Sequence, residues 1–225
     1  MSYRAILFDF DFTLADASQA ILAGFRHALE QMGLPQAEED AVRRTIGLPL
    51  EDAFTLLTGR DAPEERRQFR ALFSQVAVPM QIESTRIFPG AEELLRSLKS
   101  AGIPAAIVST KRAETLRAVL ERRDLLRCFA SVTGSEMVSR PKPDPEGLLG
   151  AVAALGLTPG QCLYCGDTTI DANAARNAGM DFCAVLNGTT PGEAFAGLPH
   201  VHIAPDLIEL RTWLGLDRSA PGCPL

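Results

Sequence analysis

The chain has little of what would assign it to a membrane or nucleic-acid class. No apolar run in its 225 residues approaches the roughly 20 residues that span a bilayer. The N-terminal stretch MSYRAILFDFD turns acidic where a signal peptide would stay apolar, so we expect no signal peptide. Lysine is scarce, since 19 of the 22 basic residues are Arg, and the net charge is −6. That charge gives no general attraction to nucleic acid or to an anionic membrane, and we expect neither as a partner.

The five cysteines form no scaffold-like pattern. An odd count without such a pattern favours a reducing, cytoplasmic location over a disulfide framework. Cys162 and Cys165 make a C-x-x-C pair, but no second pair or nearby His completes a zinc site. Because they lie in the apolar run QCLYCGD, we predict that both are buried structural residues.

Apolar runs and helical patterns alternate along most of the chain. This alternation is typical of an α/β protein with a parallel sheet. Helices are predicted near 113–123, 145–155 and 170–178. The predicted strands are Ala5–Phe8, Pro104–Val108, Ala130–Thr133, Cys162–Cys165, Asp181–Val185 and, more weakly, His200–Ile203.

One long stretch interrupts this alternation. Between Asp16 and Glu83 the patterns are helical, as in SQAILAGFRHALEQMG, and no strand is predicted. The turn FPG at 88–90 then restarts a helix. The sequence therefore predicts an α/β core at 1–15 and 84–216, a helical insert at 16–83, and a loosely ordered tail at 217–225.

Polar residues follow four of the predicted strands or strand regions. In parallel α/β sheets, ligands bind at the carboxyl ends of strands, so these residues could meet at one edge. Each also has a structural explanation: an Asp can cap a helix, a Ser-Thr pair can form a turn, and a Lys between prolines can be an exposed charge. The residues are Asp9 and Asp11, then Ser109, Thr110 and Lys111, then Lys142 in SRPKPDP, and finally Asp167 and Asp171 in GDTTID.

Taken together, these residue types suit phosphoryl transfer. A carboxylate can attack phosphorus and form an aspartyl-phosphate. Mg²⁺ takes carboxylate ligands and shields the attacking group from an anionic substrate. A hydroxyl and a lysine neutralise the oxygens of the transferring group, while a second acid serves the leaving oxygen. Asp9 and Asp11 are separated by one residue, and such a pair is tolerable when a cation and separate roles divide them.

The stretches DFDFTL, VSTK, RPKPDP and GDTTID resemble the four motifs of the haloacid dehalogenase superfamily, in its phosphatase branch. The resemblance covers essentially residues 4–214. It implies a doubly wound, Rossmann-like parallel sheet and, in this branch, a helical cap inserted after the first motif. The predicted insert at 16–83 has that position and that type of structure.

The resemblance also implies catalytic roles. Asp9 would be the nucleophile and Asp11 the general acid and base. Lys142 would hold the phosphoryl group and steady the nucleophile. The hydroxyl that binds the phosphoryl would come from Ser109, with Thr110 beside it as the alternative.

A magnesium site follows from the same resemblance. Asp9, Asp167 and the backbone carbonyl of Asp11 would hold Mg²⁺, and Asp171 would support the site directly or through water. The sequence departs from the family at Phe12, where a Gly is usual. A bulky ring at that position weakens any inference about the leaving group.

Within the superfamily, Asp11 argues against the dehalogenating and phosphonate-cleaving branches, which differ at this position. The phosphonate branch also uses a cap Lys, and 16–83 contains no Lys. The stretches TIGLPLEDAF, PGAEELL and GDTTIDANAARNAGM most resemble phosphoglycolate phosphatases, which act on a small phosphorylated metabolite. A phosphosugar mutase and a non-catalytic binding or regulatory protein are the alternatives. We expect a monomer or a homodimer.

Overall fold

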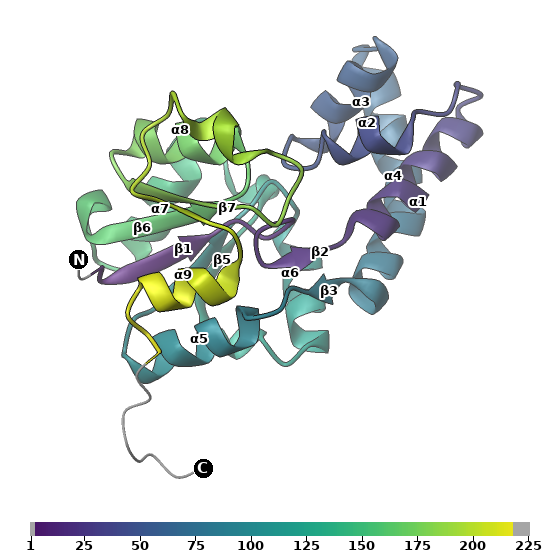
Figure 1. The fold of residues 1–225 in the computed structure, drawn as a ribbon. Coiled ribbons are helices and arrows are strands. Elements are labelled where there is room, and N and C mark those ends of the chain that lie inside the picture. The colour runs from purple at the N-terminus through teal and green to yellow at the C-terminus, as the bar shows by residue number, and fades with distance from the viewer. Residues whose placement is uncertain (1–2, 218–225) are drawn as a thin grey trace.

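A six-stranded parallel sheet lies at the centre of the fold in the computed structural model, which describes residues 3–217 (Figure 1). The strand order is β5-β4-β1-β6-β7-β8, and every neighbouring pair is parallel. The predicted doubly wound α/β fold is therefore confirmed. The strands are β1 (Ala5–Phe8), β4 (Ala105–Val108), β5 (Phe129–Thr133), β6 (Cys162–Gly166), β7 (Asp181–Val185) and β8 (His202–Ala204).

Helices cover both faces of this sheet. On one face lie α5 (Ala91–Ser100), α6 (Ala113–Arg122) and α9 (Leu207–Trp213), and on the other lie α7 (Glu146–Ala154) and α8 (Thr169–Ala178). A strand buried on both faces has no polar side, which is why β1 reads as the unbroken apolar run AILF. Short 3₁₀ turns complete the connections at Leu126–Cys128, Ser135–Met137, Pro159–Gln161 and Gly192–Phe195.

The C-x-x-C pair lies in β6 as predicted. Cys162 packs in the apolar cluster on the α7/α8 face, and Cys165 packs in the cluster on the opposite face. Residues three apart in a strand point to opposite sides, so the two thiols cannot form a pair. Both are free and buried, which agrees with a structural role.

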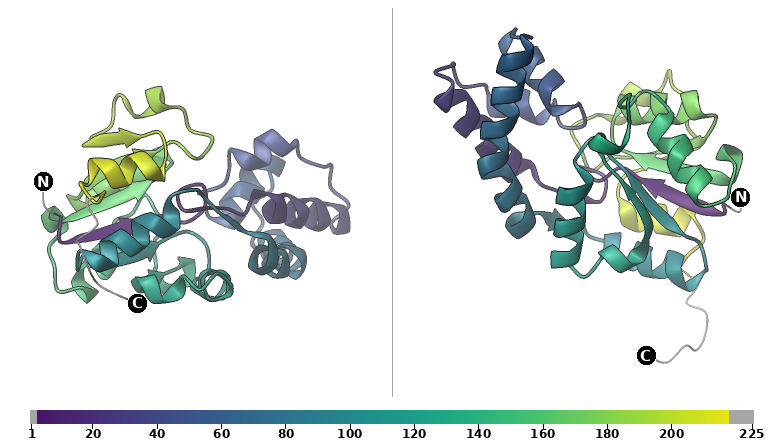
Figure 2. Two further views of the ribbon diagram at one scale, coloured as in Figure 1. Left: turned by 60° about the horizontal axis from the view of Figure 1, so that its bottom comes forward. Right: turned by 180° about the vertical axis from the view of Figure 1, so that it is seen from behind.

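Four helices, which we call the insert, form a separate group at one end of the sheet (Figure 2). They are α1 (Ser18–Gln31), α2 (Glu39–Arg43), α3 (Leu50–Thr58) and α4 (Pro63–Ser84). The insert has an apolar cluster of its own, in which Phe54 stacks on Phe69 with ring centroids 4.5 Å apart. In this group α1 and α4 approach so closely that a Cβ on Gly24 would overlap Phe73 and Ala77.

Two short strands join the insert to the core. β2 (Ala15–Asp16) and β3 (Arg86–Ile87) pair as an antiparallel ladder, which the sequence did not predict. Asp16 Oδ2 also lies 2.8 Å from Arg86 Nη2. A ladder of two residues on each side has too little periodicity to be recognised in a sequence.

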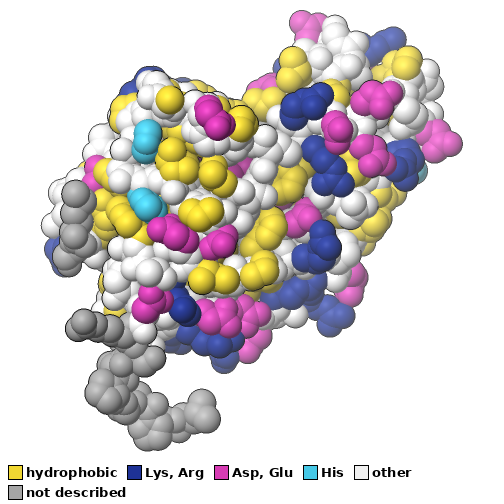
Figure 3. Space-filling view, in the orientation of Figure 1, with side chains coloured by type: hydrophobic (Ala, Val, Ile, Leu, Met, Phe, Trp, Pro, Cys, Tyr) yellow, Lys and Arg dark blue, Asp and Glu magenta, His cyan; other side chains and the backbone are white. Residues whose placement is uncertain are grey.

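Acidic and basic side chains are intermingled on the surface. In the face that Figure 3 draws, Lys or Arg and Asp or Glu alternate over the insert at the upper right. Several of these charges pair locally, such as Arg26 with Glu39 and Arg66 with Asp52. Exposed pairs of this kind contribute little to stability, at most about 1 kcal/mol each.

Most predicted strand limits agree with the structure within a residue, and Asp181–Val185 agrees at both ends. The last strand is the exception, because β8 begins at His202 rather than at His200. No helix in residues 3–217 is long and apolar enough to cross a membrane. The domain limits 1–15, 16–83 and 84–216 stay a prediction, and the predicted tail, apart from Asp217, lies outside the described residues.

Candidate active site

The site lies where the strand order reverses. β1 is flanked by β4 on one side and β6 on the other, and the chain continues outward in both directions. Asp9, Ser109 and Asp167 are the first residues after these three strands, so the parallel sheet presents them at one edge. Two backbone bonds fix this edge: Asp9 N–H donates to the Cys165 carbonyl at 2.9 Å, and Ser109 N–H donates to the Thr133 carbonyl at 3.1 Å.

Lys142 reaches this edge from the loop before α7. Its Nζ lies 2.6 Å from Asp171 Oδ1, 3.2 Å from Asp9 Oδ1 and 3.0 Å from the Tyr164 hydroxyl. The side chain is only 5% exposed. Burial lowers the pKa of Lys142, but the carboxylates of Asp171 and Asp9 outweigh it and raise the pKa above its usual value. Lys142 is therefore a fixed positive charge against Asp9.

Three buried carboxylates surround this single ammonium. Asp9, Asp167 and Asp171 each offer an oxygen, and the three atoms lie within 4.8 Å of one another. Burial raises the pKa of Asp9 to about 6, although Lys142 opposes the shift. Burial, followed by the charges of Asp171 and Asp9, raises the pKa of Asp167 well above its usual value. The protein alone thus leaves this cluster with excess negative charge, which a divalent cation would balance.

Asp171 is already surrounded by donors. Its Oδ1 faces Lys142 and the Tyr164 hydroxyl at 2.6 and 3.0 Å. Its Oδ2 accepts from the backbone N–H and the hydroxyl of Thr168 at 3.1 and 2.6 Å, as part of a capping box at the start of α8. A carboxylate has about four lone-pair positions, and four donor groups lie beside them here. Of the three acids, Asp171 is therefore the least free to accept a further partner.

Thr13 and Gly188 lie beside Asp167 and were not identified from the sequence. The Thr13 hydroxyl donates to Asp167 Oδ1 at 3.0 Å, and Asn187 Nδ2 donates to the Thr13 carbonyl at 3.1 Å. Gly188, in the loop after β7, approaches so closely that a Cβ there would overlap Asp167 Oδ2 and crowd Phe12. Thr13 lies two residues after Asp11, so its place in DFDFTL was the only available signal. Nothing in the sequence links Gly188 to Asp167.

Gly188→Ala is expected to displace Asp167. The added methyl has no room beside Oδ2, so the carboxylate must move and any cation that it holds should bind more weakly. Disturbing groups that orient a metal ligand typically costs about 10- to 100-fold in affinity or activity. Turnover measured against added Mg²⁺ should therefore require more metal. Gly197→Ala is the control, because nothing lies within 4 Å of a Cβ at that exposed site. An unchanged metal requirement in Gly188→Ala would contradict this account.

Phe12 has a left-handed backbone, with φ 57°. Glycine takes this conformation readily, whereas a residue with a bulky side chain is strained there. The turn is closed by Phe12 N–H, which donates to the Ala15 carbonyl at 2.8 Å. The Phe12 ring is buried beside the site, and the burial of this apolar ring offsets the strain in its backbone.

Asp11 lies in the same turn, beyond the end of β1, and is not part of the cluster of Asp9, Asp167 and Asp171. Its Oδ2 lies 3.0 Å from Lys111 Nζ, and its buried Oδ1 has no hydrogen-bond partner. Thr110, next to Lys111, donates its hydroxyl to the Gly47 carbonyl of the insert at 3.2 Å. Thr110 is thereby engaged with the insert, whereas Ser109 is buried beside Asp9.

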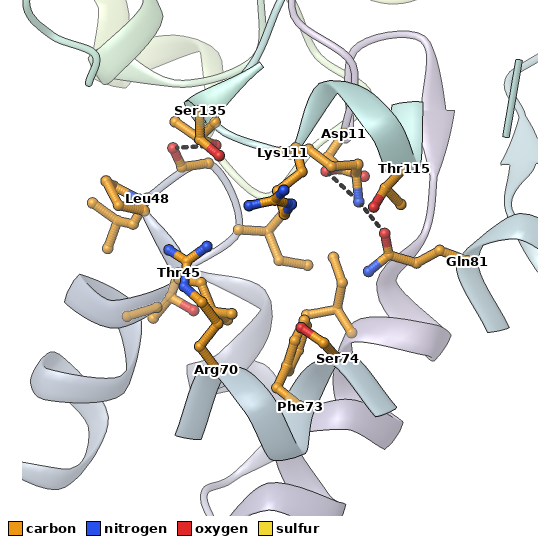
Figure 4. Close-up of a pocket in the computed structure, with 18 of the residues that line it drawn as sticks. Asp11, Thr45, Leu48, Arg70, Phe73, Ser74, Gln81, Lys111, Thr115 and Ser135 are labelled. Atoms are coloured by element: carbon orange, nitrogen blue, oxygen red, sulfur yellow. Dashed lines mark hydrogen bonds and ion pairs between the residues drawn. The ribbon is translucent and has the colours of Figure 1, made fainter. Parts of the chain in front are cut away.

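A cavity of about 120 Å³ opens beside Asp11, between the insert and the core (Figure 4). Asp11 is the only acidic residue that lines it in the described chain, while Lys111, Arg70 and Arg112 supply positive charge. Its walls are mostly apolar and include the loop at 46–50. The cavity suits a small molecule with an apolar part and an anionic group.

The structure thus brings Asp9, Lys142, Asp167 and Asp171 into one buried cluster. It places Asp11 and Thr110 at the adjoining cavity. Tyr164 could not be singled out from the sequence, since a tyrosine in the apolar run CLYCG is typical of an ordinary core residue.

Comparisons with known proteins agree with this geometry. The family described as haloacid dehalogenase-like hydrolase matches residues 6–185. "Probable phosphatase IndB" of Dickeya dadantii is 37% identical over 188 residues, covering 81% of each chain. The phosphoglycolate phosphatase of Escherichia coli K12 is 31% identical over 238 residues, covering 96% of this chain and 94% of that protein. A solved haloacid dehalogenase-like hydrolase from Bacteroides fragilis is 38% identical, with a TM-score of 0.90 over 93% of this chain and 100% of that one.

Proposed function

Since this chain belongs to the haloacid dehalogenase-like hydrolases and is a hydrolase of phosphate esters, we propose that it cleaves a small phosphate monoester through an aspartyl-phosphate on Asp9, with Mg²⁺ as cofactor. The observation that carries this proposal is the buried cluster at the strand-order reversal. There Asp9 lies 3.2 Å from a lysine that compensates its charge and beside a second carboxylate, Asp167.

Asp9 is the proposed nucleophile. An Asp9 oxygen attacks phosphorus, the bond from phosphorus to the ester oxygen breaks, and the phosphoryl group stays on Asp9. Lys142 supports this step because its buried ammonium neutralises both the nucleophile and the incoming phosphoryl oxygens. The Ser109 hydroxyl, which is buried beside Asp9, is the proposed donor to the transferred group.

The residues present fit a divalent cation. Asp9 Oδ1 is buried with only the 3.2 Å ion pair to Lys142, and that one ammonium serves a cluster of three carboxylates. Asp9, Asp167 and the backbone carbonyl of Asp11 are the proposed ligands, all oxygen donors of the kind that Mg²⁺ prefers. Asp171, with donors around both its oxygens, is the proposed support for Lys142. When bound, Mg²⁺ would neutralise charge on the phosphoryl group.

Asp11 is the proposed acid and base. Asp11 lines the cavity, where its carboxyl can donate a proton to the leaving oxygen of a bound ester. After the alcohol departs, the same carboxylate can accept a proton from the water that hydrolyses the aspartyl-phosphate. The proton released in the second step replaces the one given in the first.

The proposed substrate is a small phosphorylated metabolite of the phosphoglycolate type. Two observations support a leaving group that carries a negative charge, such as a carboxylate. Some relatives are described as phosphoglycolate phosphatases, and three cationic side chains line the cavity. A reducing, cytoplasmic location is part of the proposal, in keeping with four free cysteines in the described chain. Turnover of phosphoglycolate, pyrophosphate and sugar phosphates tests the substrate. Isomerisation of a sugar phosphate without phosphate release would instead favour a phosphosugar mutase.

Asp11→Asn is expected to separate the two chemical steps. An alkyl phosphate needs a proton on its leaving oxygen, so its cleavage should fall by about 10²–10⁴-fold. p-Nitrophenyl phosphate needs little protonation, so the first step should continue while hydrolysis of the aspartyl-phosphate stalls. Rapid mixing should show a burst of nitrophenolate near one equivalent of enzyme, followed by slow turnover.

The control for this experiment is wild-type enzyme, in which the burst should be absent or small because both steps proceed. Equal losses for both esters, with no burst and no trapped phosphoenzyme, would show that Asp11 has another role.

A further inference from the structure

Lys111 is a buried cation to which neither the sequence motifs nor the proposed mechanism gives a task. It follows Ser109 and Thr110 in the loop after β4, and its side chain is 8% exposed. Its Nζ lies 3.0 Å from Asp11 Oδ2 and donates to Gln81 Oε1 at 2.7 Å, as the dashed lines in Figure 4 mark. A buried ammonium is costly unless its partners compensate it, so these contacts need an explanation.

The contact fixes the orientation of the Asp11 carboxylate. Lys111 holds Oδ2, while Oδ1 is buried and has no hydrogen-bond partner. A proton donor must be held within hydrogen-bond reach of the leaving oxygen, so an Asp11 side chain that rotated freely would be a poor acid. By holding Oδ2, Lys111 therefore keeps the Asp11 carboxylate in one orientation at the wall of the cavity.

The third member of this group comes from the insert. Gln81 lies in the last turn of α4, is only 4% exposed, and lines the same cavity. Asp11 and Lys111, by contrast, come from core loops that follow β1 and β4. The chain Asp11–Lys111–Gln81 thus crosses from the core to the insert. If α4 moved away, Lys111 would lose one of its two acceptors. Its side chain would then be less fixed, and so would the orientation of Asp11.

We propose that Lys111 is a positioning residue that orients Asp11 for proton transfer, and that Gln81 makes this orientation depend on the seating of α4 against the core. The inference rests on the proposed function, because it takes Asp11 as the acid. It adds that the insert acts on the acid through one ammonium, that of Lys111.

The test compares kcat/KM for an alkyl phosphate and for p-nitrophenyl phosphate in the full-length enzyme. This constant reports the steps up to and including the first phosphoryl transfer, where only the alkyl ester needs the acid. In Lys111→Met, both values should fall because a charge is lost, but the alkyl value should fall about 10- to 100-fold further. Lys111→Arg, which keeps the charge, should recover part of that ratio. Lys99→Met is the matched control, since Lys99 is exposed on α5.

A double variant tests whether Lys111 acts through Asp11. If it does, Asp11→Asn with Lys111→Met should show the same alkyl-to-aryl ratio as Asp11→Asn alone. Gln81→Met removes the acceptor from α4 while leaving the Asp11–Lys111 pair in place. It should shift the ratio in the same direction by a smaller factor, and it serves as the test if Lys111→Met fails to fold.

Three results would overturn the positioning role: equal losses for both esters, a rise in KM with kcat unchanged, or independent effects in the double variant. Wild-type turnover of both esters and its loss in Asp9→Asn secure the proposed function separately. A failure at Lys111 would then leave that function standing, whereas an active Asp9→Asn would remove it.

Discussion

Asp9→Asn is expected to abolish turnover of every ester, by on the order of 10⁴-fold or more. The amide nitrogen and oxygen of Asn carry no negative charge, so neither can replace the carboxylate as a nucleophile toward phosphorus. The loss should not depend on the leaving group, because no phosphoenzyme forms with either an alkyl or an aryl ester. Steady-state release of phosphate and intact-mass measurement of acid-quenched enzyme give the two readouts.

The fold should survive this substitution. Asp9 is a buried acid whose pKa is raised to about 6, mainly by burial, so a neutral amide of the same shape is not costly there. Asp61→Asn makes the same chemical change at an exposed position of the insert and should behave as wild type. Full turnover in Asp9→Asn, or a phosphoenzyme trapped on another residue, would refute the assignment of the nucleophile.

Removal of divalent metal is expected to have an effect of similar size. Dialysis against EDTA should reduce turnover to background, and added Mg²⁺ should restore it, because the single charge of Lys142 does not balance the three carboxylates of the cluster. Binding should also show without any substrate. At a hundredfold excess over its dissociation constant, a ligand stabilises the fold by about 2.7 kcal/mol. For a domain of this size that corresponds to a rise in melting temperature of roughly 5–10 °C.

Asp167→Asn distinguishes metal binding from general salt effects. This variant should lose both turnover and the magnesium-dependent rise in melting temperature. Its metal-free form should nevertheless melt higher than metal-free wild type. The sign follows from the raised pKa of Asp167: a carboxyl with that shift destabilises the fold when ionised at neutral pH, and an amide removes the charge. Full activity in EDTA with no metal in the protein would refute the magnesium site.

The sequence predicted the parts of this fold that depend on local pattern. β1 and β7 agree at both ends because each is a short apolar run closed by a polar residue or a turn. The rule that ligands bind at the carboxyl ends of parallel strands predicts that Asp9, Lys142 and Asp167 lie at one edge of the sheet. Those residues do meet, since the parallel sheet leaves their loops no other edge.

What the sequence did not predict depends on contacts across long separations. Lys111 is part of the motif VSTK, but its partner Gln81 lies thirty residues earlier, on α4. No local sequence pattern indicates where α4 packs against the core. Gly188 matters because of one side chain in another loop, that of Asp167. Phe12 has a left-handed backbone. Residues with a bulky side chain rarely take that conformation, so the sequence does not predict it.

The ladder between β2 and β3 has a consequence for how such chains diverge. The chain leaves the core at Asp16 and returns at Arg86, and these two residues are paired with each other. In polymer terms the helices between them form a single loop whose ends are already joined. The entropy of closing a loop grows only slowly with its length. An insert of different size could therefore replace this one without altering the register of the sheet. The specificity of the enzyme could then change while its phosphoryl-transfer chemistry stayed the same.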